Sequence, residues 1–262
     1  MQLSKHQALG NDFLVLVDRQ RDRSDLADVA RAACDRRTGI GADGLLTLSD
    51  GVDGADVTMS LHNADGGRAE MSGNGISCLV QAAVVGGLAA GPEVTVSTDA
   101  GLRTVRIEPT EAPHGHLVTV DMGEVTAGDE AADWLRPGVE AARFADAGNP
   151  HLVLHVPDPS SGPDLDALGV EANATVAGGV NVELITATDT GIRLDVYERG
   201  VGRTQACGTG ASAAAVVAAA WGLVDAEVAV DMPGGTAQLT VGERVEMTVP
   251  VTAVARVEYL GA

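Results

Sequence analysis

The chain has 262 residues, of which 45% are hydrophobic and 21% charged, and its formal net charge is −20 at pH 7. This length predicts one large domain or two medium ones, with enough chain to bury a substantial core. The excess of acidic residues excludes a protein that binds nucleic acid by neutralising phosphates, and it argues against docking on an anionic membrane. The sequence has no run of about 18 apolar residues and no secretory pattern at its start, so we expect a cytoplasmic protein.

The first half of the chain predicts mostly strands, with two helices. A short helix is expected at 26–34, and a second helix is expected in ISCLVQAAVVGGL, ending at its Gly-Gly pair. A turn-rich loop, NADGGRAEMSGNG at 63–75, precedes the second helix. Strands are expected at 11–18, after a glycine-rich turn within 39–49, and at 57–61, 93–97, 102–108 and 116–122. The polar segment 123–137 is expected to form a surface loop or a short helix.

The second half predicts a similar series. Strands are expected at 151–156, within 178–187, and at 192–197. The glycine-rich loop GVGRTQACGTG then leads into an alanine-rich helix, ASAAAVVAAAWGLV. Further strands are expected near 227–231, 236–241 and 244–249.

One pattern occurs twice in the chain. EMSGNGISCLVQAAVVGGL and QACGTGASAAAVVAAAWGL both place a small nucleophilic residue, two glycines and then an apolar helix. The equivalent residues, Ser72 and Cys207, are 135 positions apart, about half the chain. Chance is the alternative, because the chain has 33 glycines. We favour a duplication that gives two similar α/β halves, each presenting a helix N-terminus to a shared cleft.

The cysteines predict neither a disulfide framework nor a zinc site. Cys34, Cys78 and Cys207 are odd in number and far apart, with no CxxC pair, and the six histidines are scattered, so we expect no metal. Cys34 and Cys78 are expected to be buried thiols. Cys207 stands where a helix would begin, and a helix N-terminus lowers a thiol pKa. The alternative is that Cys207 simply packs under the helix.

The sequence predicts chemistry by side chains alone. The sole lysine is Lys5, and neither a GxxxxGK[ST] loop nor a strand-associated GxGxxG is present, so we expect no cofactor. Two helix N-termini around one small ligand favour proton transfer from opposite faces of a carbon. Their amide N–H groups would stabilise charge that develops on a neighbouring carboxylate.

Seven segments in order resemble diaminopimelate epimerases: GNDF (10–13), GIGADGLL (39–46), NADGGRAEMSGNG (63–75), GNPH (148–151), NVE (181–183), YERGVG (197–202) and ACGTG (206–210). The resemblance implies two pseudo-symmetric α/β (α+β) domains, each a curled, mostly antiparallel sheet around a central helix, with the active site in the cleft between them. We expect residues 1–112 with 251–262 to form the first domain and 113–250 the second. The resemblance also implies a homodimer and a cofactor-independent isomerase. Such an enzyme interconverts LL- and meso-2,6-diaminopimelate, an amino-acid substrate, in lysine and peptidoglycan precursor biosynthesis.

The resemblance also assigns roles to individual residues. Cys207 matches the proton acceptor, Gly208 and Thr209 match residues that bind the reacting carboxylate, and His151 and Glu198 match residues that tune the thiols. The remaining matches to substrate-contacting positions are Asn11, Asn63, Gly73, Asn74, Asn149, Asn181, Glu198 and Arg199. Without the resemblance, Asn63 and Asn149 would be interpreted as turn residues and His151 as a hydrogen-bonded core histidine.

The sequence departs from the family at two positions. Ser72 stands where the family has a second active-site cysteine, the usual proton donor, and Ser77 stands where it has an arginine. Three interpretations of Ser72 stay open: an asymmetric Ser/Cys pair that still epimerises, a changed substrate, or an engineered or degenerate substitution. We favour the first, because the other substrate-matching positions are retained.

Two further hypotheses compete with the epimerase. One is a racemase, epimerase or isomerase of the same architecture that acts on a different amino acid. The other is a binding protein that kept the ligand cleft but lost catalysis. Isotope exchange at the α-carbon separates the three.

Overall fold

The computed structural model describes residues 1–69 and 71–261. The chain divides into two units: unit 1 comprises residues 1–120 and 249–262, and unit 2 comprises residues 121–248. The predicted mixed α/β class is confirmed, with strands predominating over helices in both units. None of the helices in the described ranges is long and apolar enough to cross a membrane.

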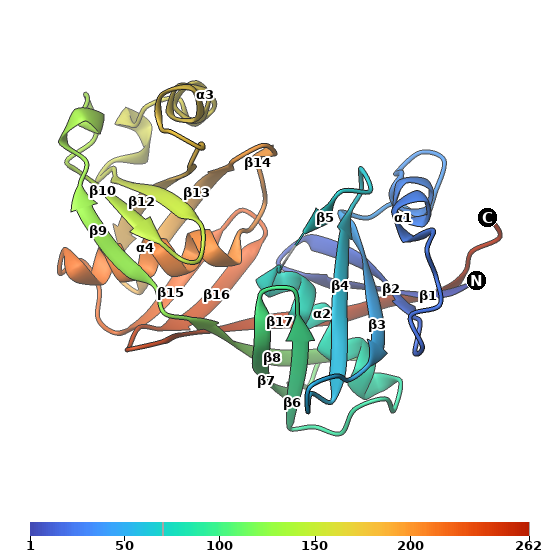
Figure 1. Ribbon diagram of the computed structural model, residues 1–262. Coiled ribbons are helices and arrows are strands. Elements are labelled where there is room, and N and C mark those ends of the chain that lie inside the picture. Colours follow the sequence, from blue (N-terminus) through green and yellow to red (C-terminus); the bar gives the residue numbers. More distant parts are fainter. Residues whose placement is uncertain (70, 262) are drawn as a thin grey trace. The chain divides into compact units, whose positions relative to one another are not determined.

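Unit 1 is a barrel-like sheet around one central helix (Figure 1). Its helices are α1 (Leu26–Cys34) and α2 (Gly73–Val85). Its strands are β1 (Gln2–Ala8), β2 (Asn11–Val17), β3 (Gly44–Asp50), β4 (Val57–Asn63), β5 (Arg68–Ala69), β6 (Glu93–Thr98), β7 (Gly101–Pro109) and most of β8 (Gly115–Gly123). Pairing runs from β1 through β2, β3, β4, β6, β7 and β8 to β17 (Val245–Glu258), which pairs with β1 again. The sheet therefore closes around α2, of which ten of the 13 residues are buried.

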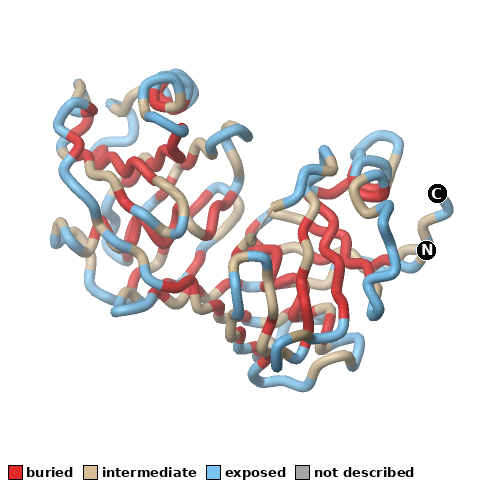
Figure 2. The backbone as a smooth tube through the Cα atoms, viewed as in Figure 1, coloured by how far each residue is buried: buried red, intermediate tan, exposed pale blue. Residues whose placement is uncertain are grey.

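Unit 2 repeats this plan around α4 (Gly208–Ala220), which packs against seven strands of the unit. Its strands are β9 (Thr126–Glu130), β10 (Ala141–Asp146), β11 (Pro150–His155), β12 (Asn181–Thr188), β13 (Gly191–Glu198), β14 (Gly202–Arg203), β15 (Glu227–Met232), β16 (Gly235–Thr240) and the first part of β17. The other helical segments are α3 (Leu165–Thr175) and two short 3-10 turns, Ala132–Trp134 and Pro159–Ser161. In Figure 2 the buried residues of each unit gather in its interior, along the strands and the central helix.

The two central helices begin and end in the same way, 135 residues apart. Ser72 caps α2 by accepting a hydrogen bond from Gly75 N–H, and Cys207 caps α4 by accepting one from Gly210 N–H. At the other end, Leu88 N–H donates to Ala83 O and Leu223 N–H donates to Ala218 O, next to glycines with positive φ. These are matching Schellman motifs, which satisfy the last carbonyls of each helix.

The strands that lead to the two helices also match. β2 pairs in parallel with β3, placing Phe13 opposite Gly44, and β11 pairs in parallel with β12, placing His151 opposite Asn181. The same register makes Phe13 the counterpart of His151 and Leu46 the counterpart of Glu183. Each unit therefore offers the same backbone positions beneath its central helix, filled with different side chains.

The structure adds elements that the sequence did not predict. Segment 123–137 was expected to be a surface loop or a short helix. It contains the short 3-10 helix Ala132–Trp134, but 126–130 forms the unexpected strand β9, which pairs with β10 although four of its five residues are exposed. Helix α3 was not expected, since Gly169 lies in its middle and glycine disfavours helix by about 1 kcal/mol. A Cβ at Gly169 would lie 2.2 Å from the Tyr197 ring, so the glycine is what lets α3 pack on β13.

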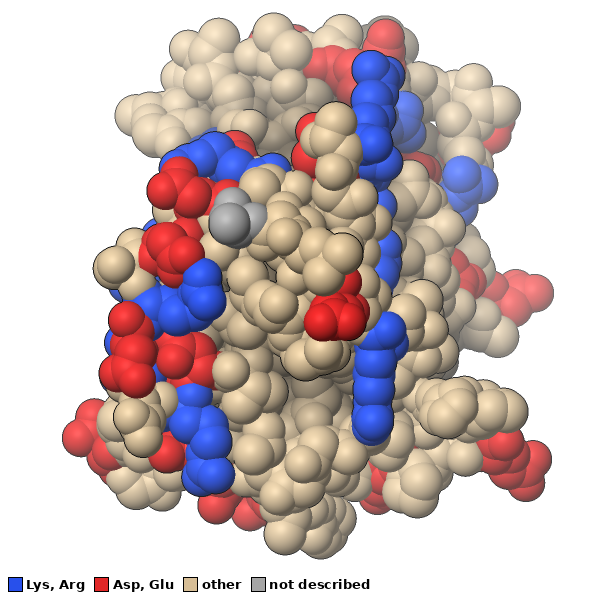
Figure 3. Space-filling model, turned by 90° about the vertical axis from the view of Figure 1, so that its right-hand side faces the viewer, with Lys and Arg blue, Asp and Glu red and all other residues tan. Residues whose placement is uncertain are grey.

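Many of the basic side chains pair with acidic ones, and the excess of acidic residues leaves the chain strongly negative. Figure 3 shows basic side chains lying beside acidic ones around a broad area of uncharged residues. In unit 1 the pairs Arg19–Asp50 and Arg68–Asp99 are 2.7 and 2.8 Å long. Such exposed pairs contribute little to stability, so solubility is the main consequence of this surface charge.

Candidate active site

Cys207 stands at the N-cap of α4, where the chain leaves an extended conformation and enters the helix. Its Sγ lies 3.4 Å from Gly210 N and 3.5 Å from Thr209 Oγ1, and the residue is 7% exposed. Gly208 is buried beneath the Met247 and Met122 side chains. A Cβ at this position would lie only 3.2 Å from Met247 Cε, so the packing favours glycine. The sulfur is thus held at the positive end of the helix dipole, among the N–H groups of its first turn.

The expected lowering of the Cys207 pKa is wrong for this structure. Burial raises the pKa of the thiol well above its ordinary value, and the nearby Glu198 carboxylate raises it further; the contacts with Thr209 and Gly210 N–H offset only part of this. Desolvation disfavours the charged thiolate, and here it outweighs the two hydrogen bonds that favour it. Cys207 is therefore held as a neutral thiol.

This charge state predicts slow alkylation of Cys207 in the folded, ligand-free protein. A raised thiol pKa lowers the thiolate fraction tenfold per unit, so labelling by iodoacetamide at pH 8 should be at least about tenfold slower than after unfolding in urea. Mass spectrometry of the peptide that contains Cys207 measures the rate. Folded protein that is labelled at neutral pH as fast as unfolded protein would contradict the prediction.

A buried pair of titratable side chains lies beneath the α4 N-terminus. His151 Nδ1 is 2.7 Å from Glu183 Oε1, His151 Nε2 is 2.9 Å from Asn149 Oδ1, and both His151 and Glu183 are 0% exposed. Burial raises the pKa of Glu183, although His151 opposes the shift. A Cβ at Gly210 would lie 2.9 Å from Glu183 Oε1, so glycine lets the carboxylate pack against the helix turn that Cys207 caps. The buried His151 ring therefore connects Glu183 to Asn149 through its two nitrogens.

Glu183 was not among the residues predicted from the sequence to form the site. It ends the NVE segment that carried part of the family resemblance, but only Asn181 of that segment was selected. The sequence did offer one signal: Glu183 lies among apolar residues in a segment expected to form a buried strand. Charged residues are almost never fully buried without a partner, so such a glutamate indicates a specific contact.

Asn181, 4% exposed, holds the loop that carries Arg199. Its Nδ2 donates to Pro150 O at 3.1 Å, and its Oδ1 accepts a hydrogen bond from Arg199 N–H at 2.8 Å. The Arg199 guanidinium donates to Gly178 O at 2.8 Å, and Arg199 is exposed. Asn181 therefore positions the backbone of Arg199, another of the predicted site residues.

Replacing Asn181 by alanine should destabilise the protein by about 2 kcal/mol, because two partly buried hydrogen bonds, to Pro150 O and from Arg199 N–H, are lost at about 1 kcal/mol each. The shift of the urea unfolding midpoint measures this. Asn63→Ala is the control, since Asn63 is exposed and the change should stay below about 0.5 kcal/mol. Equal effects of the two substitutions would show that the Asn181 bonds carry no net stability.

Glu198 ends β13 near Cys207. Its Oε1 accepts a hydrogen bond from Thr204 Oγ1. Unit 2 thus groups one thiol with a half-buried carboxylate, a buried histidine and a buried glutamate. It gathers these predicted residues in one place: His151, Asn149, Asn181, Glu198, Arg199, Cys207, Gly208 and Thr209.

Unit 1 carries the other predicted residues, and its helix N-terminus has fewer titratable side chains around it than that of unit 2. Ser72 Oγ lies 3.0 Å from Gly75 N, Gly73 and Asn74 begin the buried first turn of α2, and the Asn74 Oδ1 is buried without a partner among the described residues. Leu46 packs against Gly75 where unit 2 has Glu183. Ser77 is 0% exposed and donates to Gly73 O at 2.8 Å, as Ser212 donates to Gly208 O.

Asn11 and Asn63 lie at strand ends of unit 1. Asn11 Nδ2 donates to Asp43 Oδ2 at 2.7 Å, and Arg36 binds Asp43 and Asp12 at 2.8 and 2.7 Å. Asn63 is exposed, and its backbone forms a tight turn by accepting from Gly66 N–H and donating to Gly67 O. The turn chemistry considered for Asn63 is thus present.

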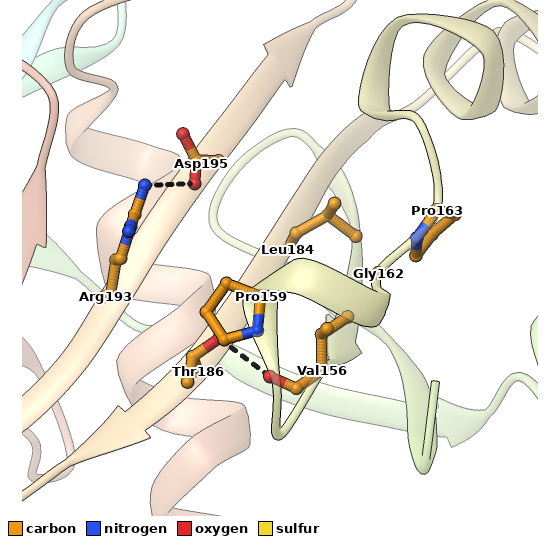
Figure 4. A pocket seen from close by; sticks show the side chains of 8 residues that line it. All are labelled: Val156, Pro159, Gly162, Pro163, Leu184, Thr186, Arg193 and Asp195. Carbon is orange, nitrogen blue, oxygen red and sulfur yellow. Dashed lines mark hydrogen bonds and ion pairs between the residues drawn. The ribbon is translucent and has the colours of Figure 1, made fainter. Parts of the chain in front are cut away.

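No group of three metal-ligating side chains occurs among residues 1–69 and 71–261. A small pocket of about 50 Å³ lies in unit 2 and contains none of the predicted site residues; its lining side chains are drawn in Figure 4. It is lined by Val156, Pro159, Gly162, Pro163, Leu184, Thr186, Arg193 and Asp195, and it has room for a few water molecules rather than an amino acid.

The fold matches that of several solved structures over nearly the whole chain. A predicted epimerase from Pseudomonas aeruginosa superposes with a TM-score of 0.75 at 14% identity, covering 100% of this chain and 99% of its own. A probable proline racemase from Agrobacterium radiobacter K84 gives 0.73 at 16% identity, with 98% and 92% covered.

Sequence similarity defines the family. The diaminopimelate epimerase family model matches residues 3–127 and 143–255. The diaminopimelate epimerase of Mycobacterium avium (strain 104) is 37% identical in an alignment that covers 92% of this chain and 90% of the relative. The chain belongs to the diaminopimelate epimerase family, which confirms the resemblance found in its motifs.

Proposed function

We propose that this protein is an isomerase that interconverts LL- and meso-2,6-diaminopimelate without a cofactor. One observation carries the proposal: two helices 135 residues apart are each capped by a proton-transferring side chain, Cys207 on α4 and Ser72 on α2. Membership of the diaminopimelate epimerase family supports the substrate.

The proposed reaction begins with the substrate carboxylate at the first turn of α4. The N–H groups at the start of a helix have no intrahelical partners, so those of Gly208 and Thr209 are suited to bind it. Cys207 first loses its S–H proton to water, and the thiolate then takes the α-proton: the Cα–H bond breaks, an S–H bond forms, and the electron pair passes into the carboxylate. The oriented N–H groups stabilise that charge as it develops.

Ser72 supplies the opposite proton in this proposal. Its O–H bond breaks as a new Cα–H bond forms on the other face, and the alkoxide recovers its proton from water. Serine is a much weaker acid than cysteine, so the step is slower than with two thiols.

The remaining predicted residues suit a zwitterionic diacid. Arg199 is able to bind a carboxylate through two N–H groups, Glu198 is able to hold an ammonium group, and asparagines offer both donors and acceptors. Asn74 Oδ1, buried and unpartnered within the described chain, fits an acceptor for a substrate donor.

The deciding experiment incubates the reduced protein with meso-diaminopimelate in heavy water and follows α-deuteration and LL-isomer formation. Deuterium at the α-carbon with formation of the LL isomer supports the proposal. Exchange with another amino acid but not with diaminopimelate would establish a different substrate. Ligand-induced thermal stabilisation without exchange would establish a binding protein.

We further propose a homodimer in the cytoplasm. All three cysteines are free, and Cys207 must stay reduced to transfer a proton, which fits a reducing compartment. The dimer rests on the family resemblance, and light scattering tests it: a mass near 26.6 kDa, that of one chain, would overturn it.

A further inference from the structure

The two units hold their candidate substrate-binding asparagines in opposite orientations. Asn11 and Asn149 are counterparts, each two residues before the strand position taken by Phe13 in unit 1 and His151 in unit 2. Asn11 uses its amide nitrogen, which donates to Asp43 Oδ2. Asn149 uses its amide oxygen, which faces His151 Nε2 at 2.9 Å. Asn11 therefore keeps its oxygen for a ligand, whereas Asn149 keeps its two N–H donors.

The orientation of Asn149 depends on which nitrogen of His151 carries a proton. Asn149 Oδ1 only accepts, so His151 Nε2 must be protonated for this contact to be a hydrogen bond. A neutral imidazole with a proton on Nε2 has an acceptor at Nδ1, and Nδ1 lies 2.7 Å from Glu183 Oε1. That contact is favourable only when a proton lies between Nδ1 and Oε1, shared by the buried pair.

Glu183 is placed to keep that proton. The pair is completely buried beside the first turn of α4, and Glu183 Oε2 has no hydrogen-bond partner among the described residues. Burial therefore disfavours an ionised carboxylate more than His151 and the Leu152 N–H favour it. Burial also raises the pKa of Glu183, which is the direction that retains a proton. In unit 1 the corresponding residues, Phe13 and Leu46, are apolar, and no such relay exists at those positions.

We propose that Glu183 is a positioning residue: through His151 it fixes Asn149 with its N–H donors directed to the substrate, so that Asn149 recognises a carboxylate. This rests on the proposed function for the identity of the substrate. Asn11 and Asn149 thus offer opposite hydrogen-bonding groups to a ligand. Unit 1 presents an acceptor suited to an ammonium group, and unit 2 presents donors suited to a carboxylate.

The first test needs no turnover. Nitrogen-15 NMR of imidazole-labelled protein reports which ring nitrogen of each histidine is protonated, and His151→Phe identifies the His151 signals. We expect a protonated Nε2 in the wild type and in Glu183→Gln, whose amide N–H is able to donate to Nδ1, and a loss of this preference in Glu183→Leu. An unprotonated Nε2 in the wild type would overturn the proposal, even if the protein proves to be inactive.

The second test separates KM from kcat in the isotope-exchange assay. Glu183→Leu should raise KM by about tenfold, the value of one hydrogen bond to a ligand, with a smaller change in kcat, and Glu183→Gln should restore KM to within about threefold of the wild type. The double variant His151→Phe/Glu183→Leu reproduces the apolar pair of unit 1 and guards against misfolding of the single variant. It should fold and keep the raised KM.

Leu46→Met is the matched control at the equivalent position of unit 1 and should leave KM unchanged. A KM in Glu183→Leu equal to that of the wild type would overturn the proposal. Failure of Glu183→Gln to restore KM would also overturn the proposal, because the rise in KM in Glu183→Leu would then come from lost charge or altered packing. Absence of exchange in the wild type would count against the proposed function alone, since the NMR result decides the role of Glu183.

Discussion

Replacing Cys207 by serine should lower α-deuteration of the substrate by about 10²–10⁴-fold, the usual contribution of a positioned acid–base group. Serine is a good helix N-cap, and Ser72 already fills this role at the equivalent position, so the fold should be kept. The loss would therefore report the chemistry of the sulfur. Deuterium incorporation measured by mass spectrometry gives the rate.

The control for this substitution is Cys34→Ala. Cys34 is a buried thiol on α1, and its pKa is raised to about 11, first by burial and then by Asp12. Its removal should cost some stability but leave exchange intact. Wild-type exchange in Cys207→Ser would remove the sulfur from the mechanism.

Replacing Ser72 by cysteine should accelerate epimerisation by about 10²-fold, because a thiol is a far better proton donor than a hydroxyl and the cap position is unchanged. The rate of conversion between the LL and meso isomers measures this. Ser72→Ala should abolish inversion and destabilise the protein by about 1 kcal/mol, since Gly75 N–H loses its cap.

Ser77→Ala is the matched control, since Ser77 lies one turn further along α2 with its hydroxyl bonded to Gly73 O. It should leave the rate unchanged. Inversion at the wild-type rate in Ser72→Ala would show that Ser72 carries no proton. Failure of Ser72→Cys to accelerate the reaction would show that this step does not limit it.

The buried position of Ser77 also bears on its role. Replacement of the family arginine by Ser77 gave one reason to consider a different substrate. The Ser77 side chain is 0% exposed and bonded within its own helix, as is its counterpart Ser212. The Ser77 hydroxyl is therefore not available to a ligand, and the bearing of this position on the substrate lies in the missing arginine.

The sequence was most informative where local chemistry decides the structure. The Gly-Gly stop after α2, the strand at β2 and the helix at α1 follow from periodicity and turn residues, and all three are present. Repetition of a small residue, two glycines and an apolar helix was enough to indicate Ser72 and Cys207 as matching helix starts. Elements such as β9 and α3 were missed because exposed strand residues and a mid-helix glycine acquire their structure only from partners distant in the sequence.

By itself, the sequence determined the family, the α/β class, the two helix caps and the residue types available for proton transfer. Only the tertiary structure decided the charge state of those residues. It buries Cys207 beside Glu198, which keeps the thiol protonated, and it places Glu183 against His151, so that an unselected residue joins the site. The reason is physical: a pKa depends on desolvation and on charges that folding brings near, and neither is written in local sequence.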